Sequence, residues 1–231
     1  MLVEKTDHMG SDLSIVNAAR VSFGKRKKHL DSGDTKLIQY LADHNHWSPF
    51  GHASMQFHID APIFVARQLV KHTVGLTWNE VSRRYVNDDP TFHKVDRWRG
   101  KPIDKKQGSS DASVEFVKLN QRIPELHKIP TDTLKTQVEN VAFTNYKLMI
   151  DAGVAPEQAR MILPQSTMTQ WYWSGTLYAF ARVCNLRCKP DAQWETRVIA
   201  DLIDALCRIQ FPISWEALRG KADDGRDSDK E

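Results

Sequence analysis

The chain has 231 residues and a formal net charge of +3; 41% of its residues are hydrophobic and 26% are charged. These proportions are typical of globular proteins, and so small a net charge gives no reason to expect nucleic-acid binding. The sequence has no apolar run near the roughly 18 residues of a membrane-spanning helix, and its first residues lack the apolar segment of a signal peptide. We therefore expect a cytoplasmic protein that has neither a membrane nor a nucleic acid as its partner.

The first part of the chain predicts two helices, a strand and a third helix. A capping serine or aspartate suits the start of a helix over residues 11–22, and a second helix is predicted over 34–45. Hydrophobic and polar residues alternate over 55–60, which is the periodicity of a strand. Pro62 then suits the first turn of a helix, because the N–H that proline lacks would have no intrahelical partner there.

The rest of the chain predicts a long loop and then mostly helices. Residues 87–110 are rich in Asp, Pro, Lys, Arg and Gly, which indicates a loop with at most short structure. The later predicted elements are a helix over 134–149 that ends before Gly153, a short helix over 156–162, a strand over 167–173, a helix from a capping Ser174 to about Arg187, and a helix over 191–210. Because no repeat or linker interrupts this order, we predict one α+β domain over 1–219, with helices packed on an antiparallel sheet. A charged, disordered tail is predicted over 220–231.

The predicted loop contains several cations around Trp98, namely Lys94, Arg97, Arg99, Lys101, Lys105 and Lys106. Such a cluster could form a nucleic-acid-binding patch. Four aspartates lie among these cations, however, and they favour a solvated loop. A nucleic-acid-binding module therefore remains only an alternative.

The three cysteines are Cys184, Cys188 and Cys207. An odd count in a cytoplasmic protein argues against a disulfide framework. Cys184 and Cys188 are four residues apart on one predicted helix, so a metal-binding pair is conceivable. Buried apolar thiols are the favoured interpretation, and we predict no metal site.

Cations, amides, a histidine, a carboxylate and a hydroxyl are concentrated in residues 67–85. On the helix that begins near Pro62, Arg67 and Lys71 lie four residues apart and form one polar row, and Gln68 and His72 form a second beside it. Cations suit phosphate, and amides and hydroxyls suit a base or a sugar, so this cluster predicts an anionic ligand of nucleotide type. The sequence contains neither a Gly-x-Gly-x-x-Gly motif nor a Walker loop that would hold such a ligand in another way.

The second half of this cluster resembles the signature motif of the flavin-dependent thymidylate synthases, Asn-Glu-x-Ser-x-Arg-Tyr. The matching residues are Asn79, Glu80, Ser82, Arg84 and Tyr85. The first half departs from the family, because Lys71-His72-Thr73 stands in place of Arg-His-Arg and the spacer is one residue longer. Further segments similar to the family are 12–23, 46–52, 157–164, 185–187 and 192–195. We can name no resemblance for the region from about 87 to 130.

The resemblance implies a reaction, its cofactor and an assembly. The reaction is the reductive methylation of dUMP to dTMP, with methylenetetrahydrofolate as carbon donor and FAD, reduced by NADPH, as hydride carrier. The assembly is a homotetramer that binds FAD and dUMP between its subunits. None of the three cysteines stands in the Pro-Cys-His or Pro-Cys-Gln setting of the cysteine-dependent thymidylate synthases, so no thiolate nucleophile is expected.

The resemblance also implies roles for individual residues. Arg187 would be catalytic, because its permanent charge can stabilise the anionic form of the uracil ring. Ser82 would act beside the pyrimidine by positioning it, not as a nucleophile. The implied substrate-binding residues are Gln68, Lys71, Glu80, Ser82, Arg83, Arg84, Arg160 and Arg187. The implied cofactor-binding residues are His46, Ser48, Lys71, His72, Thr73, Glu80, Thr176, Tyr178 and Arg182.

Two alternatives keep the nucleotide and change the function. The altered triplet could accompany another modification at C5 of a pyrimidine nucleotide, such as hydroxymethylation. The protein could also bind a nucleotide without flavin and without catalysis.

Overall fold

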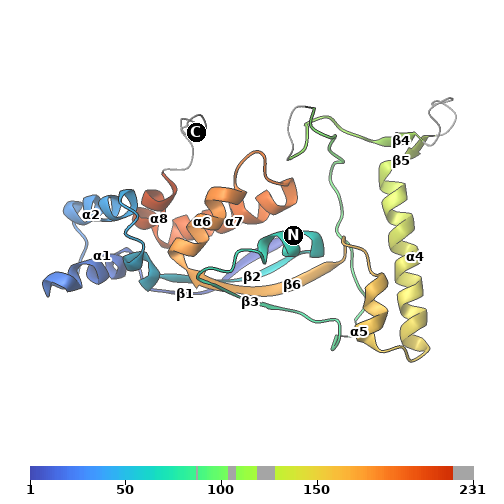
Figure 1. Cartoon of the computed structure of the whole chain (residues 1–231), viewed down its shortest axis with the longest axis horizontal. Coiled ribbons are helices and arrows are strands. Elements are labelled where there is room, and N and C mark those ends of the chain that lie inside the picture. The colour runs from blue at the N-terminus through green and yellow to red at the C-terminus, as the bar shows by residue number, and fades with distance from the viewer. Residues whose placement is uncertain (87, 104–107, 119–127, 221–231) are drawn as a thin grey trace, which may run out of the picture. The chain divides into compact units, whose positions relative to one another are not determined.

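The structure is a computed structural model that describes residues 1–86, 88–103, 108–118 and 128–220 (Figure 1). The predictions for Lys105, Lys106 and the tail over 221–231 lie outside these residues. The described chain divides into two compact units, and each unit takes its residues from several segments. One unit comprises Met1, Asp60–Leu69 and Glu80–Trp171, and is called unit 1 below; unit 2 comprises Leu2–Ile59, Val70–Asn79 and Tyr172–Glu231.

A sheet of four strands has the order β1-β2-β6-β3. Its strands are β1 (Leu2–Met9), β2 (Ser54–Pro62), β6 (Met168–Thr176) and β3 (Leu76–Glu80). At one end of β2 the N–H of Leu177 donates to the carbonyl of Ala53, and at the other the N–H of Ile63 donates to the carbonyl of Thr167. Because residue numbers rise along β2 as those of their partners fall along β6, the two strands are antiparallel.

Unit 2 contains a hydrophobic core between its strands and helices. Its helices are α1 (Asp12–Arg20), η1 (Val21–Phe23), α2 (Ser32–Asp43), η2 (Ser48–His52), α6 (Leu177–Arg187), α7 (Trp194–Gln210) and α8 (Pro212–Arg219). Phe57 of β2 and Trp173 of β6 both meet Phe180 of α6 edge to face, with ring centroids 5.0 and 5.3 Å apart. All three side chains are fully buried, and alternate residues of β2 point to the same core. This packing fixes α6, which carries Arg187 at its C-terminal end.

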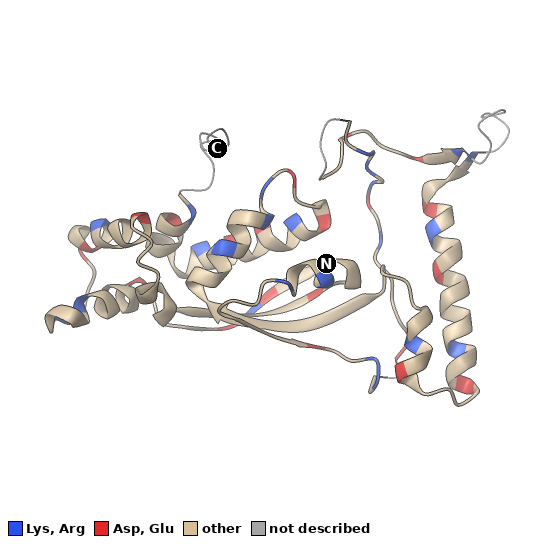
Figure 2. Ribbon diagram, in the orientation of Figure 1, with Lys and Arg blue, Asp and Glu red and all other residues tan. Residues whose placement is uncertain are grey.

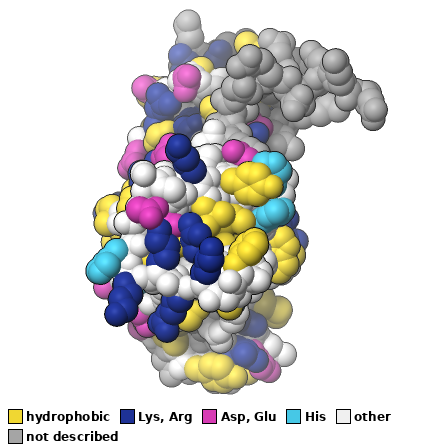
Figure 3. All heavy atoms as spheres, turned by 90° about the vertical axis from the view of Figure 1, so that its left-hand side faces the viewer, with side chains coloured by type: hydrophobic (Ala, Val, Ile, Leu, Met, Phe, Trp, Pro, Cys, Tyr) yellow, Lys and Arg dark blue, Asp and Glu magenta, His cyan; other side chains and the backbone are white. Residues whose placement is uncertain are grey.

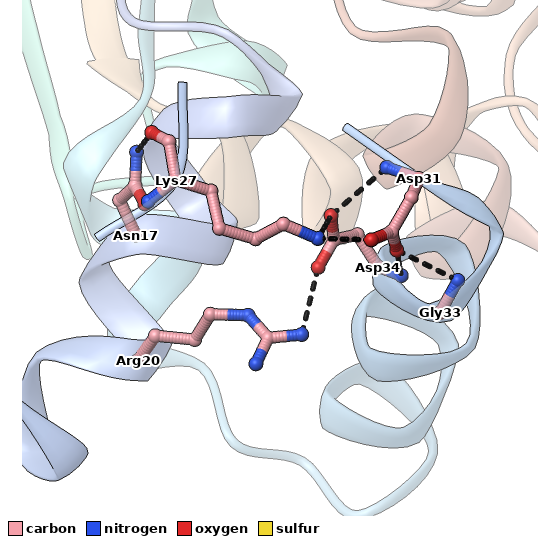
Figure 4. A network of polar contacts seen from close by, with 6 residues as sticks. All are labelled: Asn17, Arg20, Lys27, Asp31, Gly33 and Asp34. Atoms are coloured by element: carbon pink, nitrogen blue, oxygen red, sulfur yellow. Dashed lines mark hydrogen bonds and ion pairs between the residues drawn. The ribbon is translucent and has the colours of Figure 1, made fainter. Parts of the chain in front are cut away.

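A buried carboxylate ties α1 to α2 (Figure 4). The carboxylate of Asp34 accepts hydrogen bonds from Arg20 at 2.8 Å and from Lys27 at 2.5 Å. Burial raises the pKa of Asp34, but the hydrogen bonds from Lys27 and Arg20 outweigh it and bring this pKa to about 2. Asn17 holds the backbone N–H and carbonyl of Lys27 with its side chain, and Asp31 caps α2. The segment between the helices is thus pinned at Lys27, while the side chains of Lys25 and Arg26 stay exposed.

Figure 3 shows the face that lies on the left-hand side of Figure 1. On this face, Lys and Arg side chains lie beside hydrophobic side chains. Among the exposed hydrophobic side chains of the chain are Val21 and Phe23 of η1.

Unit 1 contains helices and a two-stranded sheet. Its helices are α3 (Ile63–Leu69), α4 (Thr131–Asp151), α5 (Pro156–Ala159) and η3 (Arg160–Ile162), and its small antiparallel sheet pairs β4 (Phe116–Lys118) with β5 (Lys128–Pro130). Charges of both signs are interspersed along α4 (Figure 2). The buried carboxylate of Glu139 accepts a hydrogen bond from Ser166 at 2.5 Å and pairs with Lys135 at 2.7 Å. These bonds satisfy a charge that would otherwise be costly to bury.

The predicted α+β class with an antiparallel sheet is confirmed, and most helices lie where the periodicity placed them. Two boundaries were wrong. Helix α3 ends at Leu69, so Lys71 and His72 lie beyond it and do not extend the two polar rows. Strand β6 continues to Thr176, which caps α6 by accepting a hydrogen bond from the N–H of Ala179, so Ser174 is a strand residue and not the cap.

Five short elements were not predicted, namely β1, β3, β4, β5 and α8. The predicted loop over 87–110 is confirmed for its described residues, which form only isolated bridges such as Phe92 with Thr167. No helix of the described chain is both long and apolar enough to cross a membrane.

Candidate active site

The residues that the sequence predicts for the site fall into two groups, one in each unit. The unit 2 group is His46, Ser48, Lys71, His72, Thr73, Thr176, Tyr178, Arg182 and Arg187. The unit 1 group is Gln68, Glu80, Ser82, Arg83, Arg84 and Arg160.

In unit 2, the segment that follows α3 forms one wall of a cavity of about 190 Å³, and α6 forms the other. The polar lining comes from Lys71, His72, Thr73 and Arg182, and the apolar lining from Val74, Leu76, Ala179, Val183 and Leu186. Lys71, Thr73 and Arg182 are exposed, whereas His72 is half-buried. Four of the predicted cofactor residues therefore meet in one place, although they come from parts of the sequence more than a hundred residues apart.

Arg187 contacts His72 directly. The Nε–H of Arg187 donates to Nε2 of His72 at 3.0 Å. An arginine has no acceptor, so this bond requires a neutral imidazole whose proton is on Nδ1. Burial, together with the charges of Arg187 and Arg182, lowers the pKa of His72 below its ordinary value and keeps the ring neutral. His72 thereby orients the guanidinium of Arg187 without neutralising its charge.

Glycines allow the segment after α3 to approach β6 closely. The N–H of Thr176 donates to the carbonyl of Gly75 at 3.1 Å. A Cβ at Gly175 would lie 2.4 Å from that carbonyl oxygen, so no other residue fits at this position without a shift. Gly75 itself has φ +75°, which favours glycine.

A second cavity in unit 2, of about 400 Å³, contains Thr176 but none of the other predicted residues. Its lining residues are Asp7, His8, Met9, Gly51, Ser54, Met55, Gln56, Gly75, Thr77, Ser174, Gly175 and Thr176. Most of its polar groups come from β1 and the neighbouring ends of β2 and β6. These groups were not predicted because β1 was not predicted, and β1, with Val3 as its one buried residue, has no alternating pattern that would have indicated a strand.

The turn that precedes β2 brings the remaining cofactor residues near α6. Trp47, between His46 and Ser48, packs against Tyr178 with ring centroids 6.5 Å apart. His46 lies near Tyr40, with ring centroids 6.0 Å apart, and both His46 and Ser48 are exposed.

In unit 1, the intact half of the signature motif forms the end of β3 and a tight turn. The hydroxyl of Thr169 donates to Oε1 of Glu80 at 2.8 Å. The Nε–H of Arg84 donates to Oγ of Ser82 at 3.1 Å, and the guanidinium lies over the ring of Tyr85, 4.9 Å from its centroid. Ser82 therefore acts as an acceptor that holds Arg84.

The other predicted residues of unit 1 present cations and an amide. Arg83 donates to the carbonyl of Asp88 at 2.8 Å, and Arg160 donates to the carbonyl of Glu157 at 3.3 Å. Both contacts are with neutral oxygens, so the charges of Arg83 and Arg160 are not offset by a carboxylate in these bonds. Gln68 is half-buried on α3.

Comparisons with known proteins show the family of the chain. The family model described as thymidylate synthase complementing protein matches residues 2–213. The chain belongs to this family. It is 36% identical over 215 residues to the flavin-dependent thymidylate synthase of Thermus thermophilus, covering 93% of this chain and 74% of that protein. It is also 36% identical over 211 residues to the enzyme of the same name from Thermosipho africanus, covering 91% of this chain and 87% of that one.

Among solved structures, the chain is similar to the UMP/dUMP methylase PolB from Streptomyces cacaoi bound with 5-Br dUMP. The TM-score is 0.80 at 30% identity, and the match covers 96% of this chain and 95% of that one. The resemblance found in the sequence is thus confirmed. The protein is an enzyme of the flavin-dependent thymidylate synthase family, and membership implies FAD.

The chemistry of the 190 Å³ cavity fits part of a flavin cofactor. Its apolar wall suits a planar ring, and Lys71 and Arg182 offer cations to phosphate. Complete ligand pockets usually measure about 300–1,000 Å³, so this cavity can enclose only a part of FAD.

Proposed function

We propose that the protein converts dUMP to dTMP by reductive methylation. Methylenetetrahydrofolate gives the carbon, NADPH gives the hydride, and the products are dTMP, tetrahydrofolate and NADP⁺. FAD, when bound, carries the hydride from NADPH to the transferred carbon. The observation that supports this proposal most directly is the Arg187–His72 pair beside a cation-lined cavity, in a chain of this family.

We assign activation of the uracil ring to Arg187. Electron density must rise at C5 before that carbon can attack the methylene group. A fixed positive charge near the N3–C4 edge stabilises the anionic form of the ring and so raises this density. The hydrogen bond to His72 preorganises the guanidinium, because its Nε is held while the two terminal nitrogens can still donate.

We assign dUMP binding to Gln68, Lys71, Glu80, Ser82, Arg83, Arg84, Arg160 and Arg187. Arg84 and Arg160 are the phosphate ligands, since a guanidinium binds phosphate oxygens with two parallel hydrogen bonds. Ser82 holds Arg84 and positions the pyrimidine, and Gln68, Glu80 and Arg83 supply further polar contacts.

We assign FAD binding to residues that line the 190 Å³ cavity, to the turn before β2, and to Glu80, Thr176 and Tyr178 elsewhere in the chain. The set is His46, Ser48, Lys71, His72, Thr73, Glu80, Thr176, Tyr178 and Arg182. Because the cavity encloses only part of such a cofactor, a second chain would complete the site, which supports a homotetramer with sites between subunits. We also propose that the protein acts in the cytoplasm.

The state of the cysteines supports a reaction without a thiolate nucleophile. Cys184 and Cys207 are fully buried, and burial raises the pKa of both thiols well above the ordinary value. A thiol with a raised pKa is a poor nucleophile at neutral pH.

The test is the visible absorption of the purified protein followed by turnover. We expect flavin absorption. We also expect that, with methylenetetrahydrofolate and NADPH present, dUMP is converted to a product with the mass of dTMP. Bound FAD without any change in the mass of dUMP would overturn the proposal. A protein that binds dUMP but takes up no FAD would point to a nucleotide-binding protein without catalysis.

A second candidate substrate is UMP, because the UMP/dUMP methylase PolB was solved in one structure with 5-Br dUMP and in another with 5-Br UMP. Offering UMP and dUMP together and weighing the products separates the two candidates. The same measurement identifies hydroxymethylation, since the added mass then includes an oxygen atom.

A further inference from the structure

Among the described residues, three potential metal ligands lie close together at the C-terminal end of α6. The sulfur atoms of Cys184 and Cys188 and a carboxylate oxygen of Asp204 all lie within 4.8 Å of one another. We propose that these three side chains form a binding site for a thiophilic divalent cation of the Zn²⁺ type, separate from the reaction centre.

The cluster is built by two helices of unit 2 that pack against each other. Cys184 lies on α6 and Cys188, four residues later, is the C-cap of that helix with helical backbone angles, so the two side chains share one face; Asp204 comes from α7. Two sulfur ligands with one carboxylate form a donor set that favours Zn²⁺ and Cd²⁺ over hard cations such as Mg²⁺. Cys188 is half-buried and the side chain of Asp204 is 18% exposed, so water can reach a fourth coordination position.

The carboxylate of Asp204 is already oriented by its neighbours. Its Oδ1 accepts a hydrogen bond from the Nε–H of Arg219 at 2.6 Å and another from the indole N–H of Trp215 at 3.2 Å. Its Oδ2 has one long contact, with Arg208 at 3.5 Å. Carboxylates that bind metals are commonly fixed by hydrogen bonds of this kind from outside the coordination sphere.

The charges of the cluster balance when a divalent cation is bound. Binding of a metal ion releases the two thiol protons. Two thiolates, the Asp204 carboxylate and the Glu216 carboxylate that pairs with Arg208 then carry four negative charges, and the cation with Arg219 and Arg208 carries four positive ones. An occupied site is therefore neutral, which suits its burial.

The position of the site gives it a consequence for the proposed active site. Cys188 caps the C-terminal end of α6 and directly follows Arg187. A cation held by Cys188 and Asp204 would join this end of α6 to α7 and would restrict the backbone that carries the guanidinium. The role is structural, since Cys184 is fully buried and no ligand of the cluster lines the 190 Å³ cavity.

The test is a titration of the full-length protein with Cd²⁺, followed by the ultraviolet absorption of cadmium–thiolate bonds, and then competition with Zn²⁺. We expect one cadmium ion per chain, displaced by Zn²⁺. Cys188→Ser should weaken cadmium binding by at least about 100-fold. Loss of a group that only hydrogen-bonds to a metal ligand costs up to about 100-fold in affinity, and loss of a direct ligand should cost at least as much. Cys207→Ser is the matched control, since Cys207 is a buried thiol of α7 outside the cluster, and it should bind like the wild type.

Absence of the cadmium–thiolate absorption in the wild type, or its equal loss in the Cys188 and Cys207 variants, would overturn the proposal. Asp204→Asn tests the third ligand and should weaken binding while the two thiolates remain. If that variant fails to fold because Arg219 and Trp215 lose their acceptor, the two cysteine variants still decide the result. Because the readout is metal binding, its failure is independent of whether dTMP is formed.

Discussion

The two halves of the signature segment are held in different ways. The half that departs from the family, Lys71-His72-Thr73, lies against α6, where His72 accepts a hydrogen bond from a residue 115 positions away. In the intact half, Glu80 at the end of β3 is bound by Thr169, 89 positions away, but the turn that follows is held by Arg84 and Ser82, two positions apart, which bind each other. The first half therefore depends on tertiary packing, whereas the turn of the second half is organised by local contacts.

This contrast explains which departures from the family pattern the segment can contain. Lys71 and Thr73, which stand where the family has arginines, are exposed and have room for side chains of other sizes. His72, which matches the family, is the half-buried residue that holds Arg187. The altered positions are those that can change a ligand contact without disturbing the packing.

The largest expected effect is at Arg187, in the half that depends on packing. Arg187→Ala should lower turnover at saturating dUMP by a factor of about 10² to 10³, because a preorganised charge is removed. Arg187→Lys should recover little, since an ammonium group cannot reproduce the planar guanidinium. The measurement is dTMP formation against dUMP concentration, with flavin reduction by NADPH as the control that should persist. A wild-type rate for Arg187→Ala at saturating dUMP would show that Arg187 only binds substrate.

The locally organised half should respond differently. Arg84→Ala should raise the KM for dUMP by about 10- to 100-fold, the worth of hydrogen bonds between charged groups. Its kcat should stay near the wild-type value, because a phosphate contact is equally strong in the ground state and the transition state. The control is Arg26→Ala, at an exposed arginine outside the assigned site, which should leave the KM for dUMP unchanged. A fall in kcat that exceeds the rise in KM would contradict the assignment of Arg84 to binding.

The acid limb of the pH profile of kcat tests the role of His72. Protonation removes the acceptor of the Arg187 hydrogen bond, so kcat should fall as the pH drops below the lowered pKa of His72. Stability follows the same sign: the folded state binds the proton less readily than the unfolded state, so stability is lost as the pH falls from 6.5 through the lowered pKa. His72→Ala should cost about tenfold in kcat, the worth of one hydrogen bond to a charged group.

His72→Gln provides the decisive comparison for that prediction. The amide oxygen of glutamine can accept from Arg187 but does not titrate, so the variant should keep more activity than His72→Ala and lose the acid limb. His44→Gln, at an exposed histidine, should leave the profile unchanged. An acid limb that survives in His72→Gln would assign it to another group.

The smallest effect is expected from the cysteines. Replacing Cys184, Cys188 and Cys207 together by Ala should leave turnover close to the wild-type rate when no metal is added, because none of them touches the reacting atoms. The control is FAD binding, which shows that the variant is folded. A folded, FAD-bound triple variant without dTMP formation would restore a thiolate to the mechanism.

Periodicity and capping residues predicted the long elements of the fold, because a helix such as α7 or a half-buried strand such as β2 repeats its pattern over many residues. They did not predict β3, in which Leu76 and Trp78 alternate with polar residues over only four positions, or the end of α3 at Leu69. The sequence could name Arg187 and His72 as site residues by resemblance. It could not show that they bind each other, because that contact depends on how α6 packs on the sheet.

The hydrogen bond between His72 and Arg187 also has a consequence for the synthesis of the protein. Its two partners are separated by 115 positions, so the cavity beside it cannot form on the ribosome until α6 has been translated and has left the exit tunnel. Up to that point the segment after α3 lacks its packing partner, whereas the turn around Arg84 can form as soon as it emerges. Contacts of such long range close slowly, so the nascent chain gains the turn to which we assign phosphate binding well before it gains the arginine to which we assign activation of the ring.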